Sequence, residues 1–396
     1  MRILSGLTKT KYWFLYVLML AFLLIKMIRG VYGVESSGGG VWNIIQVFFV
    51  FVGVVFFFTK YNLKIQAIDA FLFFAVWIMF ISMLNMVNHP ISSLSSWFYY
   101  LMCPCAPLVL MIFYCLGQRN EIYDFSFLIK ATYYVLIILF YISMTTYRVI
   151  DDSEDYIAFA DIYYPMCLLP LVLLQTKPLR SFIPILAILL GVIVSGKRGG
   201  LVVLAMVSFI YYFVGERRRK RSQFFLIVLF FGIVAVSTYL INFVDANYGL
   251  HSIDRLMNSM DDGGSGRMSR WEKTLSAIGM SNVWEILFGH GFGAIYGLIG
   301  GRAHNDFLEV FYNYGFVAVI LYIVFYLRLI SFNVRQYRKK YPRAKYLTCS
   351  MVVALVMAMV SFFIVEPTYI LSSMFVTGLI LGDWKKYENN GYIITS

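Results

Sequence analysis

The chain has 396 residues, of which 60% are hydrophobic and 14% are charged. A soluble globular protein carries about 25% charged residues, so this composition excludes a soluble fold and favours a membrane protein. A transmembrane β-barrel is excluded as well, because its strands alternate in polarity whereas the long runs of this chain are continuously apolar. The net charge of +12 is explained first by basic residues on the inner side of a membrane, and nucleic-acid binding is not needed to account for it.

The apolar runs predict an all-α polytopic membrane protein with about 12 transmembrane helices and one large outer loop. In chain order the predicted spans cover residues 12–28, 41–59, 67–87, 97–116, 128–147, 157–175, 181–196, 199–214, 223–243, 306–330, 346–365 and 368–382. The chain therefore divides into residues 1–243 with spans 1–9, the loop 244–305 with amphipathic helices, and residues 306–396 with spans 10–12 and a short inner tail.

Lys and Arg residues predict the orientation of these spans. When the N-terminus is placed inside, about two thirds of the 33 Lys and Arg residues fall on the cytoplasmic side, as the positive-inside rule requires. The basic runs Arg217–Arg221 and Arg335–Lys345 directly follow spans, and we interpret them as lipid-headgroup contacts. Both termini are then cytoplasmic, and the long loop before span 10 is extracytoplasmic.

The loop Asp245–Asn305 is too long to be a passive connector. Its first predicted helix has an apolar face, in which Met268, Trp271, Leu275 and Ile278 recur at spacings of three and four. Ser269 and Glu272 have the form of a capping box for this helix. Trp and Arg on an amphipathic helix indicate either a segment lying on the membrane surface or a helix packed onto the outer ends of the spans.

A second short helix is predicted at Val283–Phe288, with Asn282 and Glu285 as its capping pair and Gly289 at its end. The glycine-rich segment Gly289–Gly293 follows. No strand precedes it and its spacing is not that of a dinucleotide-binding motif. We interpret it first as a structural turn, with the alternative that the backbone N–H groups of Gly291 and Gly293 contact a phosphate.

His304 and Asn305 stand where the chain re-enters the membrane, and Asn305 or Asp306 is a good N-cap for the following span. The positive end of that helix dipole lowers the pKa of His304, which favours a neutral imidazole that can act as a general base. A lone histidine is more often structural. Arg267, Arg270 and Arg302 share the loop, however, and their presence favours the catalytic interpretation of His304.

One further charged site interrupts two apolar runs. The segment Ser195–Gly200 contains Lys197 and Arg198 at the outer surface or slightly within the membrane. An arginine at that depth is a candidate for bidentate phosphate binding, with a snorkelling hairpin as the alternative. The histidines are scattered and no ligand spacing supports a metal site, and neither a serine-hydrolase elbow nor a glycosidase carboxylate pair is present.

Together these segments resemble the superfamily of O-antigen polymerases (Wzy-type) and O-antigen ligases. The resemblance rests on the Ser195–Gly199 hairpin, the Arg267…Arg270-Trp271 helix, Gly289-x-Gly291-x-Gly293, and His304-Asn305-x-x-Leu308 at the start of a span. It is firmest over residues 190–330. The chain departs from the family pattern before Gly315, where Asn313 and Tyr314 stand and an acidic residue is expected.

The resemblance implies a GT-C-like, metal-independent glycosyltransferase of the bacterial inner membrane, with a periplasmic site and undecaprenyl-pyrophosphate-linked oligosaccharide as donor. Arg198, Arg267, Arg270 and Arg302 would hold the pyrophosphate and stabilise the leaving group. His304 would deprotonate the acceptor hydroxyl, and Asn305 would orient the base or the acceptor. The resemblance implies no cofactor; it implies membrane lipids as partners, with a chain-length regulator and a flippase of the same pathway.

Three other functions remain open from the sequence. An O-antigen ligase shares this fold and chemistry but transfers the glycan to lipid A-core, and the abundance of Phe (36) and Tyr (30) leans only slightly toward a polymerase. A lipid-linked oligosaccharide flippase also has about 12 spans, but it should show internal repeats and charges along a central cavity. A structural or scaffold protein is the least favoured of the three.

Overall fold

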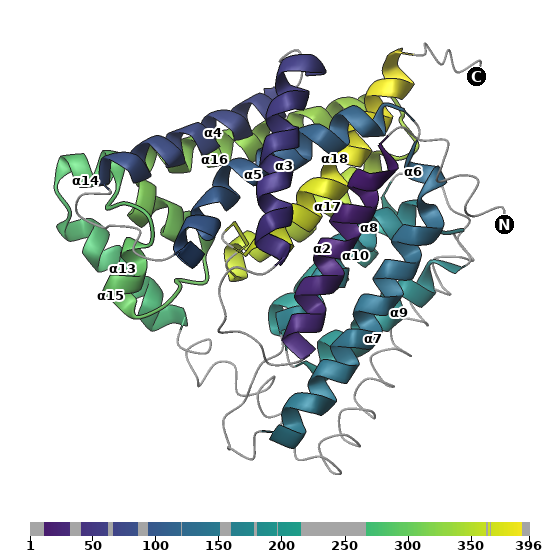
Figure 1. The fold of residues 1–396 in the computed structure, drawn as a ribbon, viewed down its shortest axis with the longest axis horizontal. Coiled ribbons are helices and arrows are strands. Elements are labelled where there is room, and N and C mark those ends of the chain that lie inside the picture. The colour runs from purple at the N-terminus through teal and green to yellow at the C-terminus, as the bar shows by residue number, and fades with distance from the viewer. Residues whose placement is uncertain are drawn as a thin grey trace.

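The computed structural model describes residues 12–31, 41–61, 66–85, 94–119, 121–150, 160–177, 180–195, 197–214, 267–361, 363–364 and 366–389. Every regular element in these ranges is a helix (Figure 1). The predicted span 223–243 and the first part of the outer loop, residues 245–266, lie outside the described residues.

The helices follow the predicted spans closely. Those before the loop are α2 (Trp13–Val31), α3 (Val41–Thr59), α4 (Gln66–Leu84), α5 (Leu94–Gly117), α6 (Glu121–Asp124), α7 (Ser126–Ile150), the 3-10 helix η2 (Ala160–Ile162), α8 (Tyr163–Leu174), α9 (Phe182–Val194) and α10 (Arg198–Phe213). Those of the loop and after it are α13 (Arg267–Met280), α14 (Val283–Phe288), α15 (Ala294–Ile299), α16 (Asp306–Arg338), α17 (Ala344–Val360) and α18 (Pro367–Asn389). Each predicted span other than 223–243 coincides with a helix.

The helical, apolar architecture is consistent with a membrane protein. By length and composition, Gln66–Leu84, Ser126–Ser143 and Asp306–Arg338 are able to cross a membrane. Other apolar helices in the described ranges are shorter, among them α8, α9 and α10. The count of about 12 spans therefore stays a prediction.

The centre of the molecule is the packing of α5 against α18. These helices approach closely because glycines meet there: a Cβ on Gly117 would lie 2.5 Å from the Leu379 carbonyl oxygen, and one on Gly378 would lie 2.5 Å from that of Leu110. Close backbone approach at small residues is the usual way in which helices associate within a membrane. Phe113 and Phe375 fill the space beside the glycines, edge to face, with ring centroids 4.5 Å apart.

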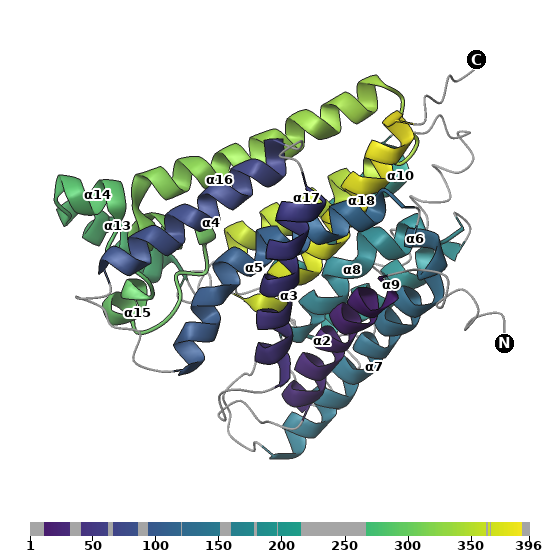
Figure 2. The same ribbon diagram turned by 45° about the horizontal axis from the view of Figure 1, so that its top comes forward.

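A long antiparallel pair, α4 and α16, runs along one side of the molecule and carries the small helices α13–α15 at one end (Figures 1 and 2). Aromatic stacking joins the pair, with 4.3 Å between the rings of Phe71 and Phe325 and 5.1 Å between those of Phe74 and Tyr322. The helix α16 has a kink at Gly315, where the backbone has φ 80°. The first ten residues of α16, next to α13–α15, build the site described below.

Candidate functional site

The helix α13 presents its arginines to the chain that precedes α16. The Arg270 Nη1 atom donates to the Arg302 carbonyl oxygen at 3.1 Å, and the Trp271 indole N–H donates to the Ala303 carbonyl oxygen at 2.8 Å. These two bonds hold the first turn of α13 against residues 302–303, directly before His304. The sequence placed Arg270 and His304 in the same loop, and the structure joins Arg270 to Arg302, 32 residues further along the chain, by an ordered contact.

One prediction about α13 is wrong. The Ser269–Glu272 capping box is absent, since the helix already includes Arg267 and places Ser269 inside it. The apolar residues Met268, Trp271, Leu275 and Ile278 lie in α13 at the predicted spacing of one helical face. Met268 and Leu275 are 51% and 54% exposed, whereas Trp271 and Ile278 are half-buried.

His304 lies in a strained turn at the start of α16. Its backbone has φ 56°, in the left-handed region that non-glycine residues seldom adopt and that is enriched at functional sites. The next residue, Asn305, is the N-cap of α16, and its Oδ1 accepts from the N–H groups of Phe307 and Leu308 at 3.0 and 3.2 Å. The predicted cap is confirmed, and it fixes the half-buried imidazole at a helix N-terminus.

Four basic side chains act on the imidazole of His304. Burial and the charges of Arg267, Arg270, Lys197 and Arg302, in that order, together lower its pKa from 6.5 to about 4. The predicted direction is confirmed, although burial and neighbouring charges cause the shift where the sequence suggested the helix dipole. An imidazole in this field is neutral at pH 7, and the same field is suited to bind an anion.

Lys197 belongs to the hairpin between α9 and α10, so the structure brings that hairpin to the same end as α13 and the start of α16. Arg198 is the first residue of α10, but its side chain lies outside the described residues. Sequence reasoning chose Arg198 and passed over its neighbour Lys197. The signal for both was the same, a pair of cations between two apolar runs.

Tyr163, at the start of α8, is a further residue of this region that sequence reasoning missed. Its hydroxyl lies close to the backbone of Gly200, whose N–H donates to the Lys197 carbonyl oxygen at 3.0 Å, and it lies near the charge of Arg267. A Cβ on Gly199 would lie 3.0 Å from that hydroxyl and 2.8 Å from Val360 Cγ2, so the hairpin approaches α8 and α17 closely. No sequence signal distinguished Tyr163, because the chain contains 30 tyrosines.

Arg302 has a different environment from Arg267 and Arg270. Its Nη1 atom lies 2.6 Å from Glu309 Oε1, and the two side chains are 18% and 2% exposed. The guanidinium also lies over the Tyr296 ring, 4.6 Å from its centroid. A buried carboxylate thus neutralises Arg302, whose contribution to the site is to fix the turn before His304.

The glycine-rich segment packs against the kink of α16. The N–H groups of His290 and Gly291 donate to the carbonyl oxygens of Tyr312 and Asn313 at 3.0 and 2.7 Å. Because Gly315 interrupts the helix, these carbonyl groups are available to the loop. The Gly291 N–H is therefore occupied, and Gly293 caps α15 with φ 73°. The structure supports the turn interpretation and gives no basis for a phosphate contact by the Gly291 N–H.

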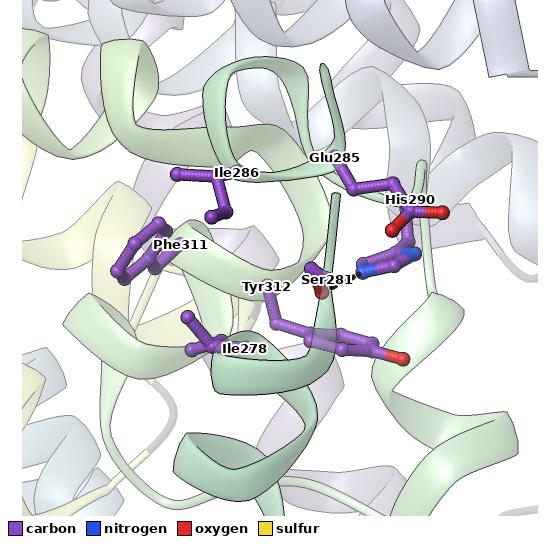
Figure 3. Close-up of a pocket in the computed structure, with 7 residues that line it drawn as sticks. All are labelled: Ile278, Ser281, Glu285, Ile286, His290, Phe311 and Tyr312. Atoms are coloured by element: carbon purple, nitrogen blue, oxygen red, sulfur yellow. Dashed lines mark hydrogen bonds between the residues drawn. The ribbon is translucent and has the colours of Figure 1, made fainter. Parts of the chain in front are cut away.

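His290 lines a shallow pocket between α13, α14 and α16, next to the point where the glycine-rich segment contacts α16 (Figure 3). The His290 ring stacks on Tyr312 at 4.4 Å, and its Nε2 lies 3.0 Å from Ser281 Oγ. The Ser281 hydroxyl donates to the Ala277 carbonyl oxygen at 2.9 Å, so it accepts from His290. In that arrangement His290 Nε2 carries a proton and is not a base for Ser281, so the pair is structural.

The capping prediction for α14 is confirmed. The Asn282 side chain accepts from the N–H groups of Trp284 and Glu285, and the Glu285 carboxylate accepts from the Asn282 N–H, which completes a capping box. Within the described residues, no group of three or more His, Cys, Asp or Glu side chains is placed to hold a metal ion.

The segment that contains these residues matches a known family. Residues 183–323 match the model of a family described as O-antigen ligase. The match spans α9, α10, α13–α15 and the first half of α16, so it contains Lys197, Arg267, Arg270 and His304. No curated protein matches the chain.

Proposed function

By its O-antigen ligase domain the chain belongs to the O-antigen polymerase and ligase superfamily, and from this premise we propose that it is a polysaccharide polymerase. In this reaction an undecaprenyl-pyrophosphate-linked glycan is transferred to a sugar hydroxyl of a second lipid-linked repeat unit. The protein would act in the bacterial inner membrane with its site on the periplasmic side. A lipid-linked donor fits a site outside the cytoplasm, where nucleotide sugars are absent.

The observation that carries the proposal is the neutral imidazole of His304 beside Lys197, Arg267 and Arg270. In the proposed reaction His304 takes the proton of the acceptor hydroxyl as general base. The acceptor oxygen bonds to the anomeric carbon of the donor from the face opposite the pyrophosphate, and the bond from that carbon to the pyrophosphate oxygen breaks with inversion. The cations stabilise the charge that develops on the leaving pyrophosphate.

The other predicted site residues receive more limited roles. Asn305 orients His304 by fixing the start of α16, through the two N–H groups that its side chain accepts. Arg198 remains a proposed pyrophosphate ligand, next to Lys197 in the chain. We leave Arg302 out of the pyrophosphate set, because Glu309 already neutralises it.

Substitution of His304, with substitution of His290 as a control, tests the assignment of the general base. His304→Gln should lower the rate of glycan transfer by about 10²–10⁴-fold, the range typical of general-base removal. His290→Gln is the matched control and should retain near-normal transfer, since the His290 ring is engaged by Ser281 and is not among the groups placed in the proposed site. Purified protein of both variants should be compared at equal expression. Full transfer by His304→Gln would refute the assignment.

Arginine substitutions test the anion site separately. Arg270→Ala and Arg198→Ala should impair transfer, and Arg270→Lys should restore little, because a lysine cannot reproduce the planar contact with the Arg302 carbonyl. The expected kinetic signature is a raised KM for the lipid-linked donor together with a lowered kcat. An unchanged donor KM in Arg267→Ala and Arg270→Ala would show that these arginines do not bind the pyrophosphate of the donor.

The ligase reaction uses the same chemistry with lipid A-core as acceptor, and a deletion strain separates the two. Loss of a polymerase leaves a single repeat unit on the core, visible as one band above the core on a glycan gel. Loss of a ligase leaves the core bare while lipid-linked polymer accumulates. The first pattern supports the proposal and the second replaces it with the ligase.

A further inference from the structure

The unit α13–α15 contains a long segment that is almost devoid of charge. From residue 274 to residue 301 the single Asp, Glu, Lys or Arg is Glu285. A water-exposed segment would carry about 25% charged residues. The one carboxylate is also engaged locally, because Glu285 Oε2 accepts from the Asn282 N–H at 2.8 Å. The segment therefore offers almost no charged group for hydration by water.

Large apolar side chains are exposed where α13 meets α14. Met280 is 79% exposed, Val283 is 68% exposed and Trp284 is 71% exposed. Single exposed apolar residues are ordinary on any protein surface. Three within five consecutive residues, two of them large, form a patch of the kind that contacts a partner or a membrane.

A ladder of aromatic rings joins this corner to a transmembrane helix. The Trp284 ring stacks on Phe288 at 5.9 Å, Phe288 stacks on Trp77 at 5.8 Å, and Trp77 contacts Phe80 at 6.2 Å. Trp77 and Phe80 belong to α4, which is long and apolar enough to cross a membrane. Phe80 is itself 51% exposed and Trp284 is 71% exposed, so the ladder connects exposed apolar side chains of α4 and α14.

The position of the aromatic ladder along α4 indicates its depth in the membrane. Trp77 lies seven residues before the last residue of the helix, Leu84, which corresponds to about 10 Å at 1.5 Å per residue. The residues of the ladder that belong to α4 therefore lie within its last two turns. That end of α4 lies beside α14 in the ribbon (Figure 2). Tryptophan is enriched at this level of a membrane protein, where the hydrocarbon meets the headgroups.

We propose that the corner formed by Met280, Val283 and Trp284 inserts into the outer leaflet of the phospholipid bilayer beside α4. Continuity with the lipid-facing surface of α4 favours lipid over a protein partner. The insertion holds α13, with Arg267 and Arg270, close to the level of the lipid headgroups. The inference rests on the membrane architecture and on the exposed residues, and it holds whether or not the proposed transfer reaction is correct.

Fluorescence quenching in vesicles tests the insertion directly. The protein is reconstituted into vesicles of phosphatidylcholine and phosphatidylglycerol whose acyl chains carry bromine near the headgroup. The spectrum of Trp284 is obtained as the difference between the unsubstituted protein and Trp284→Phe. We expect most of this component to be quenched by brominated lipid and little of it by aqueous iodide. Trp384→Phe supplies the matched control, since the ring of Trp384 is 1% exposed and its component should resist both quenchers.

Two results would overturn the inference. Quenching of the Trp284 component by iodide and not by brominated lipid would place the corner in water. Protection from both quenchers would mean that protein covers it. If Trp284→Phe does not fold, a nitroxide on Val283→Cys replaces it, with the expectation that membrane-soluble oxygen relaxes the label more than an aqueous nickel chelate does.

Discussion

The residue that governs the chemistry of the site is His304, whose imidazole stands in a positive field. With Arg267, Arg270 and Lys197 nearby, the protonated form is disfavoured and the free site holds a weak base. A bound pyrophosphate would offset these charges and raise the basicity of the imidazole. In the proposed reaction the donor thus activates the base that the acceptor requires, which limits loss of the donor to water before the acceptor arrives.

Titration of His304 follows from this electrostatics. In the ligand-free protein its pKa should lie near 4, below the ordinary 6.5, so the ring stays neutral down to well below pH 6. Arg270→Gln removes one repelling charge and should raise the pKa, as should added inorganic pyrophosphate. NMR of histidine-labelled protein measures this, with the four histidines assigned by substitution. Arg335→Gln, at the opposite end of α16, should leave the value unchanged, and an equal response to both variants would contradict the assignment.

The buried pair Arg302–Glu309 should contribute to stability through the cost of breaking it. Arg302→Met leaves the Glu309 carboxylate, 2% exposed, without its partner and should destabilise the protein by about 3–5 kcal/mol. Lys339→Met breaks an ion pair of the same 2.6 Å length, but Lys339 is 51% exposed, and the expected loss is about 0–1 kcal/mol. Thermal unfolding in detergent compares the two variants. Equal losses of stability would show that burial does not determine the contribution of these ion pairs.

Single residues differed in how far the sequence revealed them. Arg267, Arg270 and His304 were conspicuous because polar groups are rare in an apolar chain, and the structure brings all three together. Lys197 was present in the same hairpin, but the sequence favoured Arg198 because an arginine can bind a phosphate through two hydrogen bonds. Tyr163 could not be found at all, since its contact with the backbone of Gly200 depends on how α8 meets α10.

At the scale of the element, local capping signals were read correctly for α14 and α16 but not for α13, where Ser269 lies inside the helix. Contacts between elements were not predicted. The capping residues Asn282 and Asn305 are recognisable because each bonds to backbone groups within three residues. The inward turn of Trp271 depends on a carbonyl 32 residues away. The crossing of the glycine-rich segment over α16 depends on two glycines 26 residues apart, Gly289 and Gly315, whose relation no local pattern expresses.

Gly315→Ala should disrupt that crossing. The backbone of Gly315 has φ 80° and ψ 178°, a region essentially restricted to glycine that costs an alanine about 1–3 kcal/mol, and a Cβ there would also collide with the Leu287 carbonyl group. Gly297→Ala is the matched control, because no atom lies within 4 Å of its Cβ position, and it should stabilise α15 by up to about 1 kcal/mol. Protease resistance of the loop and thermal unfolding report the difference. Similar behaviour of the two variants would exclude the crossing.

At the scale of the whole molecule, the site is built by bringing helix starts together. Four helices, α8, α10, α13 and α16, begin near His304. Tyr163 stands at the start of α8, Lys197 directly before α10, and Arg270 in α13, and their contacts bring these helix starts together. In a polytopic chain every second transmembrane helix begins on the same side of the membrane. Helix starts from distant parts of the sequence can therefore lie next to one another on that side. The hydropathy pattern predicts this topology, but it does not predict which helix starts become neighbours.

The orientation of the molecule gives the last prediction. Glu272 on α13 and Lys340 after α16 are exposed residues at opposite ends of the α16 helix. The positive-inside rule places the first outside the inner membrane and the second in the cytoplasm. In spheroplasts, Glu272→Cys should react with a membrane-impermeant maleimide, and Lys340→Cys should react only after permeabilisation. Of the native cysteines whose burial the structure describes, Cys105, Cys167 and Cys349 are buried and Cys115 is half-buried, so the labelling of the protein without either substitution is subtracted as background. Labelling of Lys340→Cys in intact spheroplasts would invert the topology, move the site to the cytoplasm and remove the reason for a lipid-linked donor.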